Sequence, residues 1–394
     1  MPLKQMEVYR ILFFKCLIVG ALSASSQQES GEGTALYAQK WSAMPSETFP
    51  GGTYKYSNIA NFPGSPAISA SLITLVPGGL RELHWHNASE WAIVLNGTCR
   101  STVMESTGDA AQRPTETWDF ATGDIWYFRP NEAHMVQGLA PTGCTYLAGY
   151  NDGAFDDKKA LSTSAWLSSL PPEILAQALG ANTSVVDANV ATNTFTFMPL
   201  GPVPNTTLEQ YRASFARLPS QDVVLTHRYQ LANAAPLADN NGGWLREAST
   251  RQFKISTDMS GAVFKIAPGG MRQIHWHTTL SEWQFIINGT VRVGVFTEPG
   301  VHEESILGAG DVGYAPKGAG HWLANTSKTD PAYVILIFDD GPFTDIDLPW
   351  MLGNVPYQVT ATTLNTTLAF PESVSFVSGA GVMVGPLQNA SSTS

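Results

Sequence analysis

Short apolar runs separated by turn residues are the dominant pattern of the chain. They are rich in β-branched and aromatic residues, which is typical of strands. The clearest runs are Ala70 to Val76, Glu90 to Leu95, Ile125 to Phe128, Ala262 to Ala267, Trp283 to Ile287 and Tyr333 to Phe338. The dipeptides Asn96-Gly97 and Asn288-Gly289 predict type I′ hairpin turns. We expect an all-β protein built from jelly-roll barrels, because a closed barrel leaves such strands no free edge.

Helical patterns are confined to two places, from Ala165 to Gly180, with Pro171-Pro172 at a helix start, and around Leu348. Composition supports this picture, since charged residues make up 14% of the chain, against about 25% in typical domains. The net charge of −11 would repel phosphate backbones and anionic lipid, so we expect neither nucleic acid nor a membrane as a partner.

Residues 1–24 have the features of a secretory signal peptide. Lys4 and Arg10 precede a mostly apolar run that ends in small residues near Ala24 and is too short to span a bilayer. Because the run contains Lys15, a membrane anchor or an uncleaved tail stays open as an alternative. Residues 25–50 form a polar arm. Eight sequons suit a glycosylated, secreted, extracellular protein: Asn87, Asn96, Asn182, Asn205, Asn288, Asn325, Asn365 and Asn389.

The three cysteines divide between the targeting segment and the first half of the chain. Cys16 would leave with the signal peptide, whereas Cys99 and Cys144 lie in strand-like runs and would meet an oxidising compartment. We expect a disulfide between them, with two buried thiols as the alternative. Their role is structural in either case.

The chain repeats itself once. Residues 77–86 read PGGLRELHWH and residues 268–277 read PGGMRQIHWH. Each copy continues with Glu-Trp and Asn-Gly-Thr, and then with Gly-Asp followed ten residues later by His. The repeat predicts two related domains at 51–186 and 210–394, joined by a linker at 187–209.

Three histidines and one glutamate in each copy are candidate metal ligands. In a strand, side chains two residues apart point to one face, so each His-x-His pair directs two imidazoles into its barrel. The candidates are His84, His86, Glu90 and His134 in the first copy, and His275, His277, Glu282 and His321 in the second. A single His-x-His is most often without function. Here, six of the eight histidines in the chain belong to the repeat, which favours a metal centre in each domain.

Three imidazoles and one carboxylate favour a divalent transition metal over magnesium or calcium, and the absence of cysteine ligands argues against a structural zinc site. These ligand types do not decide between manganese and iron. Arg81 and Arg272 precede the first histidine of each pair by three residues, so strict alternation places them on the opposite face. A bulge in the strand would be needed to bring either guanidinium to the metal.

The Arg-x-x-His-Trp-His motif, the following Glu, the Gly-Asp pair and the late His resemble those of the bicupin oxalate decarboxylases, over roughly residues 50 to 360. The resemblance implies two tandem cupin domains with one manganese in each, held by the eight ligands named above. It also implies that Arg81 and Arg272 hold the substrate carboxylate. The implied reaction converts oxalate to formate and carbon dioxide, with dioxygen as a redox partner that is not consumed.

The proton donor departs from the family pattern. The family carries a glutamate in the lid over its first site, and Asp157 falls at that position, with Asp156 beside it. Asp157 is one methylene shorter, and the adjacent Lys158 and Lys159 would favour its charged form, which is unfavourable for an acid. In the second domain, Leu336 replaces the acid that the family can show there. We therefore expect the second site to be poorly equipped for protonation and to serve as a structural metal site.

Two other functions stay open. Without a good proton donor, the radical left after the loss of carbon dioxide could pass its electron to dioxygen, which would make the protein an oxalate oxidase that produces hydrogen peroxide. A non-catalytic metal-binding cupin is the other alternative. By analogy with cupin interfaces, a homo-oligomer is also expected.

Overall fold

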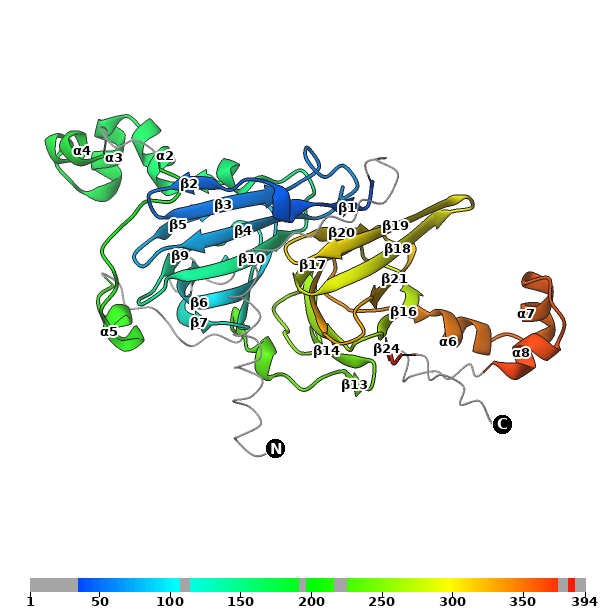
Figure 1. Cartoon of the computed structure of the whole chain (residues 1–394). Helices are drawn as coiled ribbons and strands as arrows, with labels where there is room; N and C mark the ends of the chain where they lie inside the picture. Colours follow the sequence, from blue (N-terminus) through cyan, green and yellow to red (C-terminus); the bar gives the residue numbers. More distant parts are fainter. Residues whose placement is uncertain (1–34, 107–113, 191–195, 216–224, 375–381, 387–394) are drawn as a thin grey trace.

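The structure is a computed structural model that describes residues 35–106, 114–190, 196–215, 225–374 and 382–386. Two β-barrels lie side by side, and a group of short helices extends from each at opposite ends of the molecule (Figure 1). The fold predicted from the sequence is confirmed: two tandem, mainly β domains with short helical segments after each barrel. The predicted signal peptide lies outside the described residues.

The first barrel is built around one long strand, β6, which takes part in both of its sheets. Its strands are β2 (Glu47–Phe49), β3 (Gly52–Ser57), β4 (Ser69–Leu75), β5 (Leu80–Trp85), β6 (Glu90–Met104), β7 (Thr115–Ala121), β8 (Ile125–Phe128), β9 (Ala133–Gly138), β10 (Cys144–Tyr150) and β11 (Leu161–Ser162). The main path of hydrogen-bonded neighbours is β11-β5-β9-β6-β10-β4-β3-β2.

The second barrel repeats this arrangement in two separate sheets, with the orders β1-β20-β17-β22-β15-β14-β13 and β19-β18-β21-β16-β23. Its strands are β13 (Ala238–Asn240), β14 (Gly243–Ala248), β15 (Ser260–Ile266), β16 (Met271–Trp276), β17 (Glu282–Asn288), β18 (Thr290–Glu298), β19 (Val301–Gly308), β20 (Val312–Ala315), β21 (Gly320–Asn325), β22 (Ala332–Phe338), β23 (Ile346–Asp347) and β24 (Met383–Val384). The consecutive strands β17 and β18 correspond to the two halves of β6.

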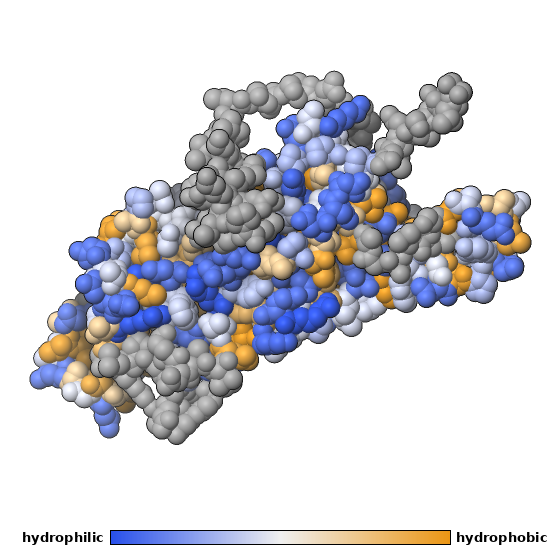
Figure 2. Space-filling view, turned by 90° about the horizontal axis from the view of Figure 1, so that it is seen from below, coloured by the Kyte–Doolittle hydropathy of each residue, from blue (hydrophilic) through white to orange (hydrophobic). Residues whose placement is uncertain are grey.

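The short helices follow the barrels. They are α2 (Thr163–Ser169), α3 (Pro172–Leu179), α4 (Thr183–Asn189), α5 (Leu208–Ala213), α6 (Leu348–Gly353), α7 (Tyr357–Thr363) and α8 (Ala369–Ser373). The predicted helix start at Pro171-Pro172 is confirmed, and Gly180 ends α3 in the left-handed conformation. Apolar side chains lie exposed among polar ones at both ends of the molecule (Figure 2). No helix among the described residues is long and apolar enough to cross a membrane.

Each barrel is extended by a short strand from the segment that precedes the other barrel. β1 (Ala38–Gln39) pairs with β20 of the second barrel, and β12 (Arg228–Tyr229) pairs with β8 of the first. The aspartates of the two Gly-Asp pairs hold these arms: Asp124 binds Arg228 at 2.7 Å, and Asp311 binds Lys40 at 2.9 Å. A shared core that includes Trp91 fills the space between the barrels. The two domains therefore form one body.

The Asn-Gly pairs are not hairpin turns, so that prediction was wrong. Gly97 lies inside β6, and Gly289 separates β17 from β18, which pair with different strands. Both glycines have positive φ (75° and 87°), and a Cβ at Gly97 would lie 2.1 Å from the carbonyl oxygen of Gly143. The dipeptide thus marks a corner at which the chain bends from one sheet into the other.

Cys99 and Cys144 form the predicted disulfide, with a sulfur–sulfur distance of 2.07 Å. Among the sequons, Asn325 is 3% exposed, and its side-chain amide donates to three main-chain carbonyls, including that of Asp330 at 2.8 Å. A glycan cannot be attached to this buried amide in the folded protein. The part of the predicted linker around Phe197 and Met198 packs into the core of the first barrel.

Candidate metal centres

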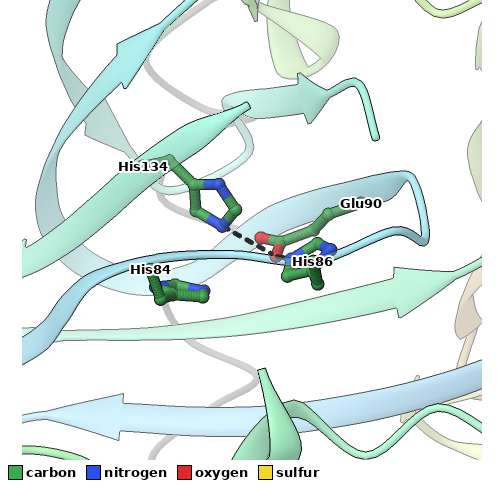
Figure 3. A group of neighbouring side chains, drawn as sticks. All are labelled: His84, His86, Glu90 and His134. Atoms are coloured by element: carbon green, nitrogen blue, oxygen red, sulfur yellow. Dashed lines mark ion pairs between the residues drawn. The ribbon is translucent and has the colours of Figure 1, made fainter. Parts of the chain in front are cut away.

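The first centre lies inside the first barrel. His84 at the end of β5 and His86 just after it face His134 on β9, while Glu90 begins β6 (Figure 3). All four residues are at most 3% exposed, and their ligand atoms lie within 4.8 Å of one another. The sequence prediction that these four residues converge on one point is confirmed.

The second centre repeats the first. His275 and His277 come from β16 and the residue after it, Glu282 begins β17, and His321 lies on β21. These side chains are at most 2% exposed, and their ligand atoms also lie within 4.8 Å of one another. The duplicated sequence motif thus produces two centres of the same geometry.

One nitrogen of every ligand histidine is held by a main-chain carbonyl. Because a carbonyl only accepts, each Nδ1 carries the proton and each Nε2 is left free to bind a metal. The bonds run from His84 to Glu82 (2.6 Å), His86 to Ala88 (2.8 Å), His134 to Glu132 (2.7 Å), His275 to Gln273 (2.7 Å), His277 to Thr344 (2.9 Å) and His321 to Ala319 (2.9 Å). Five of the six Nε2 atoms are buried without a hydrogen bond; His277 Nε2 contacts Glu282. Buried, inward-facing nitrogens without partners fit a bound cation.

A different donor orients the glutamate in each centre. Trp126 donates to one carboxylate oxygen of Glu90 at 2.7 Å, whereas Gln284 donates to Glu282 at 2.7 Å. The position that corresponds to Trp126 is Gly313, where a Cβ would lie 2.4 Å from the Gln284 amide oxygen. In each case the second carboxylate oxygen faces the histidines, at 3.4 Å from His86 Nε2 in the first centre.

The electrostatics around Glu90, His84 and His275 favour the state of each that binds a metal. Burial raises the pKa of Glu90, but hydrogen bonds and charges from His134 and His86 outweigh it, so the pKa lies well below its usual range. Burial, and then the Arg81 charge, lower the pKa of His84 well below its usual value. Burial and Arg272 do the same for His275. Imidazoles with an inward-facing Nε2 and a carboxylate are a ligand set that suits a divalent transition metal.

A β-bulge brings each arginine to its centre, as the sequence analysis required. The register of β5 against β9 shifts between Arg81 and His84, and that of β16 against β21 shifts between Arg272 and His275. Arg81 is 2% exposed and donates through Nε and Nη2 to the Asp157 carboxylate at 2.9 and 2.8 Å. Its Nη1 is buried without a partner.

Asp157 is the carboxylate that faces the first centre. It lies in a 3₁₀ turn (Asp157–Lys159), is 2% exposed, and reaches within 3.7 Å of His84 Nε2. Asp156 instead binds the Tyr54 hydroxyl at 3.2 Å. Of the two lysines beside it, Lys158 turns to Glu47 at 2.5 Å. Arg81 is the cation that contacts Asp157.

The second centre has carboxylates that sequence reasoning missed. Arg272 Nη2 binds Asp345, and its Nη1 lies 3.5 Å from Asp347. Leu336 is buried in the barrel core, and the two aspartates on Arg272 are acids near this centre that the sequence analysis did not name. The sequence contains a signal for Asp345, because the pattern Asp-Gly-x-Phe-x-Asp at 152–157 recurs at 340–345.

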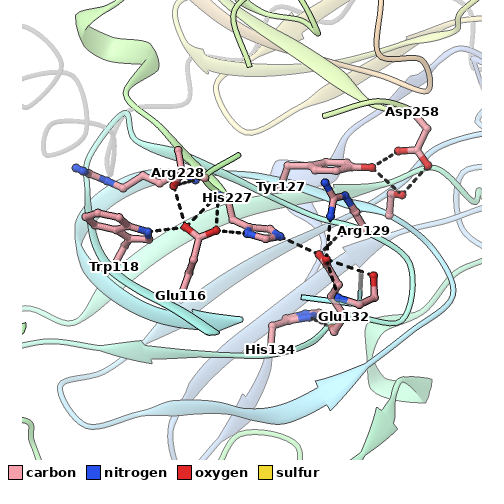
Figure 4. A network of polar contacts seen from close by, with 12 residues as sticks. Glu116, Trp118, Tyr127, Arg129, Glu132, His134, His227, Arg228 and Asp258 are labelled. Carbon is pink, nitrogen blue, oxygen red and sulfur yellow. Dashed lines mark hydrogen bonds and ion pairs between the residues drawn. The ribbon is translucent and has the colours of Figure 1, made fainter. Parts of the chain in front are cut away.

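A buried charge cluster supports His134 from behind (Figure 4). His227, which the repeat left unassigned, binds Glu116 through Nδ1 at 2.6 Å and Glu132 through Nε2 at 3.0 Å. Arg129 Nη1 lies 3.6 Å from Glu132. Glu132 in turn presents the carbonyl that holds His134. Burial lowers the pKa of His227, but the two glutamates outweigh it and raise the pKa to about 9. Both ring nitrogens are occupied, so the cluster is an imidazolium held between two carboxylates.

Two tandem barrels, each enclosing three histidines and a glutamate, define a two-domain metal-binding cupin. The cupin family profile matches residues 43–187 and 229–368, so the chain belongs to the cupin family. Within that family, the chain resembles oxalate decarboxylases.

The oxalate decarboxylase OxdC of Bacillus subtilis is 29% identical over 306 residues, covering 78% of this chain and 76% of that protein. A probable oxalate decarboxylase of Arthroderma benhamiae is 27% identical over 343 residues, covering 85% and 80%. A solved structure of the Bacillus subtilis enzyme, studied for its Mn(II) centres, matches with a TM-score of 0.81 at 25% identity and covers 94% of this chain and 99% of that chain. The chain is thus a bicupin of the oxalate decarboxylase type.

We predict that Glu90→Ala lowers metal occupancy in the first centre alone, and that Glu282→Ala does so in the second alone. Each change removes the single charged ligand of its centre, so metal content should fall from about two to about one per chain in either variant. Elemental analysis of the purified proteins measures this. Glu304→Ala, a change at the protein surface, is the matched control and should keep both metals. Full occupancy of both centres in Glu90→Ala would contradict the ligand assignment.

We also predict that His227 makes stability depend on pH. Its pKa is raised to about 9 in the folded protein, against about 6.5 when unfolded, so its contribution is complete below pH 6.5 and is lost as the pH rises through 9. The effect is on the order of 3 kcal/mol, from about 1.4 kcal/mol per pKa unit. Urea unfolding at a series of pH values should show this loss in the unaltered protein and its absence in His227→Gln. His302→Gln, at an exposed histidine, is the control. The same pH profile for His227→Gln and the unaltered protein would refute the prediction.

Proposed function

We propose that the protein is a manganese-dependent oxalate decarboxylase that converts oxalate to formate and carbon dioxide. The observation that carries the proposal is the Arg81–Asp157 pair, which places an anion-binding group and an acid beside His84 of the first centre. The oxalate decarboxylases that the chain resembles, including the Bacillus subtilis enzyme with its Mn(II) centres, support the substrate and the metal.

Manganese, held by His84, His86, Glu90 and His134 and with dioxygen as redox partner, would supply the reversible one-electron oxidation that weakens the carbon–carbon bond of oxalate. Arg81 offers its free Nη1 to one substrate carboxylate and offsets its charge. Once carbon dioxide has left, the remaining carbon needs a proton and the returned electron to become formate. Protonated Asp157 would donate that proton. The net reaction takes up one proton for each oxalate dianion.

Asp157 also supports the second candidate, oxalate oxidase. Its side chain is short, and both of its carboxylate oxygens are engaged as acceptors of hydrogen bonds from Arg81, at 2.9 and 2.8 Å. If the proton is not delivered, both substrate electrons pass to dioxygen, and oxalate, dioxygen and two protons give two carbon dioxide and one hydrogen peroxide. The ratio of formate to peroxide separates the two reactions.

The remaining parts of the proposal concern the setting of the enzyme. The apolar run that ends near Ala24 supports secretion into an extracellular, oxidising environment, with the disulfide as a compatible feature. The sequons that are exposed among the described residues are the favoured glycan acceptors: Asn87, Asn96, Asn182, Asn205 and Asn365. A homo-oligomer is proposed by analogy with other cupins.

We predict that Asp157→Asn reduces formate production at least 100-fold and leaves both metals bound, because it removes the proton donor but no ligand. Formate, peroxide and carbon dioxide should be measured on metal-analysed protein supplied with oxalate. Asp156→Asn is the matched control, since Asp156 faces Tyr54, and it should retain most of the formate yield.

Unchanged formate in Asp157→Asn would exclude Asp157 as the acid. Peroxide in excess over formate from the unaltered protein would support the oxidase. No loss of oxalate with both metals bound would support a non-catalytic metal-binding cupin.

A further inference from the structure

The turn that joins β8 to β9, residues 129–132, contacts two ligands of the first centre. Its last carbonyl, that of Glu132, accepts from Nδ1 of His134 at 2.7 Å. The main-chain N–H of Asn131 donates to the main-chain carbonyl of His86, also at 2.7 Å. A displacement of this β8–β9 turn would therefore move two imidazoles of the centre.

The turn has an uncommon shape, and one side chain fastens it. Asn131 has a φ of 64°, a left-handed conformation that glycine adopts without steric cost but a residue with a Cβ does not. The Glu132 carboxylate accepts from the main-chain N–H groups of Arg129 at 2.8 Å and of Ser106 at 3.2 Å. It also accepts from Nε2 of His227 at 3.0 Å. Glu132 is 1% exposed, so water cannot easily replace a lost donor.

His227 reaches the turn from the segment that precedes the second barrel (Figure 4). It lies directly before β12, and its main-chain carbonyl accepts from the N–H of Tyr127 at 3.2 Å. Its Nδ1 is fixed at 2.6 Å by Glu116 on β7, which also accepts from Trp118 Nε1 and from the Thr226 hydroxyl, each at 2.8 Å. A side chain from outside the first barrel is thus held against the turn that carries its ligands.

The second barrel builds the same turn from different residues. Gly318 and Ala319 stand at the positions of Asn131 and Glu132. Gly318 has a φ of 80° and donates to the main-chain carbonyl of His277 at 3.0 Å, and the Ala319 carbonyl holds the ligand histidine on β21. This turn makes the same two ligand contacts with a glycine in the left-handed position and with a methyl group in place of the carboxylate.

The arm of the second barrel is also fastened by a carboxylate, but not to the turn. Glu303 on β19 is the counterpart of Glu116, and it accepts from the main-chain N–H groups of Leu36 and Tyr37 at 2.7 and 2.9 Å. Tyr37 is the counterpart of His227, since each gives its main-chain carbonyl to the strand that follows the Gly-Asp pair. Docking of an arm and support of a ligand turn are therefore joined by a side chain in the first barrel alone.

We propose that His227 is a positioning residue of the first metal centre: through Glu132 it holds the β8–β9 turn in the geometry with which the two imidazoles bind the metal. Without His227, the buried carboxylate lacks a donor and the turn shifts to find another. The second centre does not depend on such an anchor. The inference concerns metal affinity and goes beyond the proposed reaction, so it applies equally to a decarboxylase, an oxidase and a non-catalytic cupin.

Retention of Mn(II) against a chelator, in the loaded protein, tests this. Glu282→Ala isolates the first centre and Glu90→Ala isolates the second, and bound Mn(II) is followed by elemental analysis and by its electron paramagnetic resonance spectrum. His227→Gln should weaken Mn(II) binding at the first centre about tenfold and leave the second unchanged. Glu132→Gln keeps the size of the side chain but removes its charge, and should act in the same direction.

Two further variants separate positioning from general stability. Glu303→Gln weakens the matching arm contact of the second barrel and should leave Mn(II) binding unchanged at both centres. Asn131→Gly combined with Glu132→Ala gives the first turn the residues of the second. In that doubly substituted background, His227→Gln should not weaken Mn(II) binding any further, because the turn no longer uses the carboxylate.

Unchanged Mn(II) binding at the first centre in both His227→Gln and Glu132→Gln would overturn the inference. An equal loss at both centres would also overturn it, since that is the result of a general loss of stability. So would a loss that persists at full size in the doubly substituted background, because the effect would then not pass through Glu132. If His227→Gln does not fold, Glu132→Gln carries the test.

Discussion

The bond from each ligand imidazole to a main-chain carbonyl is the constraint on which both centres depend. The main-chain carbonyl accepts the only N–H of the neutral ring. Nε2 therefore faces inward and is buried without a hydrogen-bond donor. Buried nitrogens that lack partners cost stability, and a cation removes that cost in one step. Because the carbonyls belong to the same strands and turns that build the barrel, folding the barrel and forming the metal centre are one process.

Exchanged arm strands hold the two barrels together. Neither barrel is completed by its own residues alone, since β1 is added to the second and β12 to the first. The Gly-Asp pairs, which could be taken for simple turns, provide the carboxylates that receive the arms through Arg228 and Lys40. The segment that carries β12 also inserts His227 behind the first centre. Separating the domains would therefore disturb the support of a metal ligand, so we expect the two halves to unfold together.

The sequence was sufficient for the duplication, the eight ligands and the need for a bulge at Arg81, because each depends on local spacing and strand alternation. It was insufficient where a long-range partner decides the outcome. Asn96-Gly97 has hairpin chemistry, but the strand continues because the neighbouring chain at Gly143 fixes a corner there. The two-residue arm strands carry no periodicity at all. Asp345 differs from these cases, since the second copy of the aspartate motif was visible and needed only to be aligned with the first.

Comparing the barrels separates changes that preserve a centre from changes that alter it. The hydrogen-bond donor to the ligand carboxylate is Trp126 in the first barrel and Gln284 in the second. The Gln284 side chain has room because Gly313 stands at the position of the tryptophan. That exchange keeps the carboxylate bonded and aimed, so the centre still suits a metal. The change from Tyr150 to Phe338 has no such compensation, because no other group restores a hydroxyl at that place. Metal binding therefore constrains the donor to the ligand carboxylate but not the residue at the position of Tyr150 and Phe338.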